Sequence, residues 1–162
     1  MTPSDTYAQR QIGLHWLVVG LVAFQFFTGG GMASAFEQGL SLEAGATGTA
    51  VVHGVIGTSI LIAMLGRIAV RRRYGAPAPP RTEPSWLQKI SRGNHILFYV
   101  VLIGMPLAGL LAVLTGSHLV AQVHAITSKV LLALIAAHIL GAVRHLTKRD
   151  GVVGRMLPKR TS

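Results

Sequence analysis

The sequence predicts an all-α membrane protein whose four helices form one transmembrane bundle. Hydrophobic residues make up 51% of the 162-residue chain and charged residues only 12%, a balance that is unusual for a soluble domain of this size. Four apolar segments are each long enough to cross a hydrocarbon core, which takes about 20 helical residues. Composition and segment length together predict the fold class, and the placement of basic residues predicts the orientation.

The four predicted spans are apolar throughout rather than along one stripe, which favours helices exposed to lipid. They cover residues 12–36, 50–70, 94–114 and 121–146. The first span could also be read as a secretory signal peptide. Its leader, MTPSDTYAQRQ, carries one Arg and one Asp, and its apolar run is long for such a peptide, so we expect the span to be retained.

Basic segments connect and follow the spans. Residues 71–92 are rich in Pro and Arg and are expected to form an extended cytoplasmic linker. Residues 147–162 form a basic cytoplasmic tail. Because no internal repeat is visible, residues 1–162 are predicted to be a single domain.

Charge placement predicts that both termini lie in the cytoplasm. With the N-terminus there, every Lys and Arg except Lys129 falls on the cytoplasmic side, while the outer loops carry Glu37 and Glu43. This arrangement follows the known bias of Lys and Arg toward the cytoplasmic side of a bilayer. In a soluble protein the net charge of +10 would suggest nucleic acid, but here the basic residues flank apolar spans, so no nucleic-acid partner is expected.

The absence of cysteine restricts the chemistry of any metal centre. A chain with no Cys has no disulfide framework, no iron–sulfur cluster and no c-type haem attached through a C-x-x-C-H motif. A metal must therefore be held by histidine or by oxygen ligands.

Two histidines enclose the apolar stretch HAITSKVLLALIAAH. His124 and His138 are 14 residues apart, nearly four helical turns, so they share one helix face about 21 Å apart along its axis. Depth in the other spans predicts two pairs that cross between helices, His53 with His124 near the outer side and His15 with His138 near the cytoplasm. For any single histidine, the alternative is a ring that only hydrogen-bonds a backbone carbonyl.

Paired imidazoles across a helical bundle suit a haem iron better than zinc or a di-iron centre. Zinc sites gather three or four protein ligands and di-iron bundles need several glutamates, whereas the predicted spans contain no carboxylate. Two axial nitrogens leave a haem iron without an open position, which suits electron transfer. Glycines that leave room for a planar macrocycle follow the histidines, at positions 20, 54, 57 and 141. The sequence thus predicts a four-helix bundle that encloses two haems.

Two basic side chains are candidate partners of the haem propionates. Arg67 and Lys129 lie within the second and fourth spans, although both are near enough to an interface to extend toward water instead.

Polar residues at the cytoplasmic end of the third span are candidate quinone contacts. These are His95, Tyr99 and Arg92. His95 is also an alternative to His138 as the partner of His15.

Two further histidines are weaker candidates for a role. His118 is expected in the short outer loop, either solvated or as part of an outer donor site. His145 shares a helix face with His138 but lies among basic side chains.

Several motifs resemble those of the bacterial di-haem cytochrome b561 family of inner-membrane proteins, which is related to the cytochrome b subunits of formate dehydrogenases and nickel–iron hydrogenases. In chain order the motifs are LHWL around His15, HGVIG from His53 with Arg67 fourteen positions later, NHILFYVVLIGMPLAG, HAITSKVLLALIAAH and KRDGVVGRMLP. The resemblance implies two b haems ligated by His15, His53, His124 and His138. This chain departs from the family pattern at Ser128, where a glycine is expected, and at His145, where the family often has a His-His pair.

The resemblance implies transmembrane electron transfer between an outer partner and the ubiquinone pool, in the bacterial inner membrane. Some members of the family are similar to superoxide:ubiquinone oxidoreductases, and Lys129 beside His124 could attract an anion such as superoxide. An alternative is a membrane anchor that accepts electrons from a periplasmic dehydrogenase or cytochrome. Alternatives of another class are a haem-free transporter or assembly subunit with histidines as proton relays, and a structural subunit without a redox role.

Overall fold

Four long α-helices make up most of the structure. The computed structural model describes residues 9–39, 46–78 and 83–157. Its helices are α1 (Gln9–Glu37), α2 (Ala46–Tyr74), α3 (Ser85–Thr115) and α4 (His118–Lys148), followed by a short 3-10 helix, η2 (Val153–Met156). Each of the four α-helices is long and apolar enough to cross a membrane. The predicted all-α, four-helix membrane fold is confirmed.

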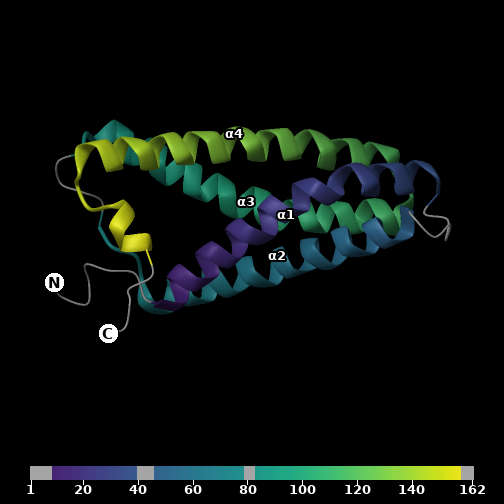
Figure 1. Cartoon of the computed structure of the whole chain (residues 1–162), viewed down its shortest axis with the longest axis horizontal. Helices are drawn as coiled ribbons and strands as arrows, with labels where there is room; N and C mark the ends of the chain where they lie inside the picture. Colours follow the sequence, from purple (N-terminus) through teal and green to yellow (C-terminus); the bar gives the residue numbers. More distant parts are fainter. Residues whose placement is uncertain (1–8, 40–45, 79–82, 158–162) are drawn as a thin grey trace.

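Successive helices run in opposite directions along a common long axis. The pairs α1–α2 and α3–α4 pack most closely, and α2 packs against α3. The first turn of α1 and the last turn of α4 therefore lie at the same end of the bundle (Figure 1). At this end η2 turns back toward the helices, because Trp16 Nε1 donates to the Met156 carbonyl at 2.9 Å and Arg155 Nη1 donates to the Ala78 carbonyl at 2.9 Å.

The predicted linker 71–92 is longer than the connection that the structure shows. Residues 71–74 complete α2, and residues 85–92 are already the first two turns of α3. Helix α2 ends before Gly75, whose φ of 70° is left-handed, a conformation that favours glycine. Pro84 precedes α3 directly, where proline is tolerated because the first N–H groups of a helix lack helical partners. Within the predicted tail 147–162, residues 147 and 148 belong to α4 and 153–156 form η2, while 158–162 lie outside the described residues.

An apolar core fills the middle of the bundle. It is formed by side chains from all four helices, namely Val18, Val22, Ile60, Ala63, Met64, Val101, Leu102 and Leu131. On α4, Leu131 is halfway between His124 and His138, so the core separates two levels of histidines. Many large apolar side chains face outward, such as Phe27 with 84% of its surface exposed, as expected for helices that contact lipid.

Candidate metal centres

The structure brings four histidine rings together as two pairs. The ring centroids of His53 on α2 and His124 on α4 are 6.2 Å apart. Those of His15 on α1 and His138 on α4 are also 6.2 Å apart. A metal bonded at about 2 Å to one nitrogen of each imidazole separates the ring centres by roughly 6 Å. Both pairs therefore have the spacing of two axial ligands on one metal ion.

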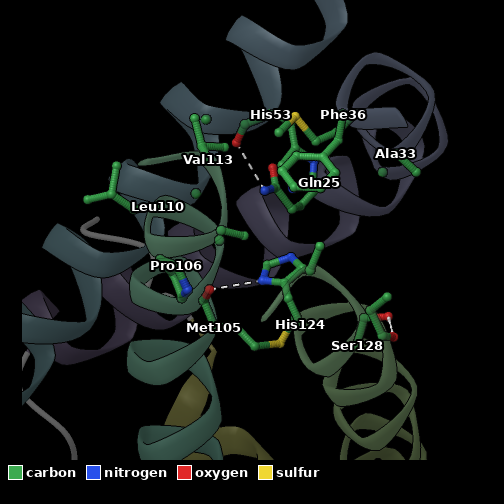
Figure 2. Close-up of a pocket in the computed structure, with 18 of the residues that line it drawn as sticks. Gln25, Ala33, Phe36, His53, Met105, Pro106, Leu110, Val113, His124 and Ser128 are labelled. Atoms are coloured by element: carbon green, nitrogen blue, oxygen red, sulfur yellow. Dashed lines mark hydrogen bonds between the residues drawn. The ribbon is translucent and has the colours of Figure 1, made fainter. Parts of the chain in front are cut away.

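Hydrogen bonds orient the rings of His53 and His124, which are called the outer pair because the charge distribution predicts that they lie nearer the outer side. His53 Nδ1 lies 3.1 Å from Thr28 Oγ1, and the Thr28 hydroxyl donates its hydrogen to the Gln25 carbonyl at 3.0 Å. Because that hydrogen is already used, Oγ1 accepts a hydrogen bond from His53 Nδ1–H. His124 Nδ1 lies 3.0 Å from the Met105 carbonyl oxygen, which only accepts (Figure 2). Both imidazoles thus carry their proton on Nδ1 and leave the Nε2 lone pair for a metal.

A large cavity adjoins the outer pair. Its volume is about 730 Å³, and side chains from all four helices line it, most of them apolar. His53 and His124 both line the cavity (Figure 2). Glu37 and His118 line it at the ends of their helices. A cavity of this size holds an organic cofactor rather than a bare ion.

Two glycines of the cavity wall make room for their neighbours. A Cβ at Gly57 would lie 3.3 Å from Gln25 Nε2, and a Cβ at Gly109 would lie 3.2 Å from His124 Cε1. By contrast, Gly20, Gly54 and Gly141 have open space beside them, which is the arrangement expected where a flat group or lipid approaches the backbone.

Gln25 connects α1 to α2 beside the outer pair. Its Nε2 donates to the His53 carbonyl at 3.0 Å (Figure 2). Its Oε1 is buried and accepts no hydrogen bond from the described residues. Such an orphaned acceptor is costly in an empty site, so it favours a site whose occupant, or an accompanying water, supplies a donor.

The rings of the inner pair, His15 and His138, contact other aromatic rings and form no hydrogen bond to another described residue. The His138 ring contacts the rings of His95 and Phe98, with centroid separations of 5.3 and 5.6 Å. The separation of 5.3 Å between His95 and His138 is shorter than two ligands on one metal require, so these two rings do not have the spacing of a ligand pair. The alternative pairing of His15 with His95 stays a prediction. His95 is exposed and its Nδ1 bonds to the Ser91 carbonyl at 2.7 Å.

The two predicted propionate partners differ in their surroundings. Arg67 is partly buried, near enough to His15 and His138 to interact with them electrostatically, and its Nη1 has no hydrogen-bond partner among the described residues. A buried, unpaired guanidinium nitrogen suits an anionic group. Lys129 is exposed, and it is its neighbour Ser128 that lines the outer cavity. The Ser128 hydroxyl donates back to the Ala125 carbonyl at 2.7 Å.

The predicted quinone contacts do not all face the same environment. Arg92 and His95 are exposed at the start of α3, whereas Tyr99 is partly buried and packs against the apolar core.

His118 belongs to a helix rather than to a loop, because it is the first residue of α4 and Ser117 caps that helix. Its ring packs against Phe36 with a centroid separation of 5.3 Å, and its Nδ1 lies 3.8 Å from the Glu37 carboxylate. The sequence did not predict these contacts.

His145 lies within a cluster of charged side chains, and both of its ring nitrogens face carboxylates rather than another histidine. Its Nδ1 is 2.6 Å from Asp150 Oδ2, and its Nε2 is 3.7 Å from Glu83, which also pairs with Arg144 at 2.7 Å. Partial burial raises the pKa of Asp150, but hydrogen bonds from His145 and from the Val152 N–H outweigh it and hold that pKa below its usual value. The cluster joins the end of α4 to the segment before α3.

Sequence reasoning missed the groups that orient the outer rings. Gln25 and Thr28 are polar residues three positions apart in a mostly apolar span, a spacing that places both on one helix face. Two polar residues on one face of a membrane helix indicate a polar contact inside the bundle, so this spacing could have identified Gln25 and Thr28. The Met105 carbonyl carried no such signal, because every residue has a backbone carbonyl.

The fold and the paired rings define a class of multi-helix membrane protein whose histidine pairs have the spacing of two ligands on one metal ion. A model of the prokaryotic cytochrome b561 family matches residues 6–159, and the chain belongs to this family. It is therefore a multi-pass bacterial membrane protein that binds haem b and takes part in electron transfer.

Three relatives are similar over nearly their whole length. Cytochrome b562 of Cereibacter sphaeroides is 28% identical over 162 residues, which cover 99% of this chain and 100% of the relative. Cytochrome b561 homolog 1 of Escherichia coli (strain K12) is 24% identical, covering 96% of this chain and 99% of the relative. A probable superoxide oxidase CybB of Yersinia pestis is 25% identical, covering 95% of this chain and 97% of the relative.

Proposed function

We propose that this cytochrome carries electrons across the bacterial inner membrane through two b haems, between an outer donor and the ubiquinone pool. One haem is ligated by His53 and His124, and the other by His15 and His138. The observation that carries the proposal is the common separation of 6.2 Å between the rings of both pairs. Packing alone gives a different value for His95 and His138, 5.3 Å.

The placement of the pairs along α4 suits a path across the membrane. His124 and His138 are 14 residues apart, which corresponds to about 21 Å of helix. This distance takes up most of a hydrocarbon core of about 30 Å. Two macrocycles would occupy part of it, with the apolar core around Leu131 between them.

The protein's own groups hold and insulate the cofactors. When bound, haem supplies one-electron chemistry. The Nε2 atoms of the four histidines would bind the two irons, two histidines to each. Arg67 would hold a propionate of the inner haem, and Lys129 is the corresponding candidate for the outer haem. Both termini lie in the cytoplasm, as the distribution of Lys and Arg predicts.

Superoxide is the proposed donor at the outer face. The similarity to a probable superoxide oxidase supports this choice. Oxidation of two superoxide ions to dioxygen yields two electrons, which with two protons reduce one ubiquinone to ubiquinol. His95, Tyr99 and Arg92 are the candidate quinone contacts. The competing role, an anchor cytochrome for a periplasmic dehydrogenase or cytochrome, requires a protein donor instead.

Ligand substitutions test the proposal directly. We expect His53→Ala and His124→Ala to abolish the same low-spin b-type signal in reduced-minus-oxidised spectra, and His15→Ala and His138→Ala to abolish the other. If each single variant loses both signals, Met substitutions decide the pairing, because Met raises the potential only of the haem that it ligates. A purified protein without a Soret band would contradict the proposal and favour a haem-free transporter or a structural subunit.

Reduction assays identify the donor. In oriented vesicles, superoxide generated outside is expected to reduce the haems rapidly, whereas ascorbate is expected to act slowly. Reduction only by a periplasmic redox protein would contradict the choice of superoxide and support the anchor role.

A further inference from the structure

We propose that Gly109 is a positioning residue for the outer ligand His124. Its missing side chain exposes the Met105 carbonyl on α3, and the hydrogen bond that His124 donates there fixes the ring and lowers the reduction potential of the outer haem. The inference rests on the proposed ligation of that haem by His53 and His124.

The contact follows from the spacing of two residues on α3. Met105 and Gly109 are four positions apart in the helix Ser85–Thr115, so they lie on the same face. In an α-helix a carbonyl points toward the residue four positions ahead. A ring from another helix can therefore reach the Met105 oxygen only across position 109. His124 does so, with its Nδ1 at 3.0 Å from that oxygen (Figure 2).

The space at position 109 is already filled by the His124 ring. A Cβ there would lie 3.2 Å from Cε1 and 3.3 Å from Nδ1 of that ring. These distances are shorter than ordinary van der Waals contacts between carbon atoms, which begin near 3.5 Å. Gly104, on the same helix, offers a contrast, because a Cβ at that position would meet nothing within 4 Å. Among the glycines of α3, only Gly109 thus lies against a histidine ring.

The carbonyl contact distinguishes His124 from the other three candidate ligands. His53 donates to a hydroxyl, that of Thr28. His15 and His138 form no hydrogen bond to another described residue, and their rings contact other aromatic rings instead. A hydrogen bond from the second ring nitrogen fixes the orientation of a ligating histidine and raises its basicity. Greater basicity stabilises the oxidised metal, so the outer haem has the lower potential and electrons run downhill toward the inner haem.

Gly109→Ala is the test and Gly104→Ala is its matched control. Alanine favours a helix over glycine by about 1 kcal/mol, so if neither glycine had a role beyond its place in the helix, both variants would assemble at least as well as the wild type. We expect Gly109→Ala to raise the outer midpoint potential by a tenfold change in the reduction equilibrium, about 59 mV for one electron. The inner potential in the same sample is expected to stay unchanged, as are both potentials in Gly104→Ala.

Each outcome decides the proposal. Loss of the outer haem alone from Gly109→Ala also supports positioning by Gly109, since the inner haem shows that the bundle has folded. Unchanged content and potential of the outer haem would overturn it, as would equal effects of the two glycine variants.

Wild-type protein provides a second readout if Gly109→Ala fails to assemble. NMR of the oxidised protein is expected to show a hyperfine-shifted Nδ1–H signal of His124 that exchanges slowly with D₂O, and its absence would overturn the proposal. A failure of the ligand assignment is separate, because His124→Ala would then leave the outer haem in place.

Discussion

The outer and inner histidine pairs have the same ring separation but different surroundings. At the outer pair, His53 and His124 each donate a hydrogen bond, and a cavity of about 730 Å³ adjoins them. At the inner pair, the His138 ring packs against Phe98 and His95, and the partly buried Arg67 lies nearby. The same arrangement of rings is thus stabilised by acceptors at one level and by ring packing and charge at the other. The two levels are expected to respond differently to substitution.

The largest difference is expected from removing the buried charge. Arg67→Leu deletes a guanidinium that the proposal pairs with a propionate of the inner haem, and loss of such an outer-shell partner costs 10–100-fold in affinity. We expect inner haem retention to fall by about this factor while the outer haem is retained, measured by haem content after dilution with apomyoglobin. Arg71→Leu, at an exposed position of the same helix, is the control. Equal loss of both haems would show that Arg67 stabilises the bundle as a whole.

A smaller effect, confined to the outer level, is expected from removing a single acceptor. Thr28→Val preserves shape but deprives His53 Nδ1–H of its partner, and an unsatisfied buried donor costs about 1–3 kcal/mol. The outer haem should therefore be released roughly tenfold faster or more, and Thr28→Ser should restore its retention. Thr115→Val is the control, because that hydroxyl is exposed, bonds to a carbonyl of its own helix and does not line the cavity. A change in the inner haem instead would argue against the pairing of Thr28 with the outer site.

The smallest effect is expected from the ring that packs on the inner pair. Phe98→Leu keeps most of the apolar volume but loses an edge-to-face contact with His138 worth about 0.5–1.5 kcal/mol. Retention of the inner haem should decline severalfold, without change at the outer level. Phe27→Leu, at a position where 84% of the side-chain surface is exposed, should have no effect. A shift of the outer potential by Phe98→Leu would contradict the independence of the two levels.

The helices were predictable from the sequence because lipid imposes a strong composition on them. A span must be apolar, and connecting segments collect Lys and Arg, so both features are visible without a structure. Pro84 shows where this reasoning stops. Proline predicts an extended linker, but Pro84 lies directly before α3. The predicted linker therefore wrongly includes the first two turns of that helix.

The proximity of the histidine rings was also predictable, since a helix fixes the rise between His124 and His138. The groups that orient the rings were not predictable. The Met105 carbonyl is a backbone group without a sequence signature, and Gly109 is one of 19 glycines, of which only some lie against a ring. The sequence predicts His118 in a loop, but the turn between α3 and α4 is only two residues long and His118 begins α4. The apolar pattern alone does not show where so short a turn begins and ends.

A redox titration of the purified protein, combined with a count of haem per chain, tests the central claim most directly. We expect two haem b per chain and two one-electron waves, and we expect His53→Ala to lose the wave of lower potential, which assigns that wave to the outer haem. One haem per chain with a single wave would contradict the claim that both histidine pairs ligate iron.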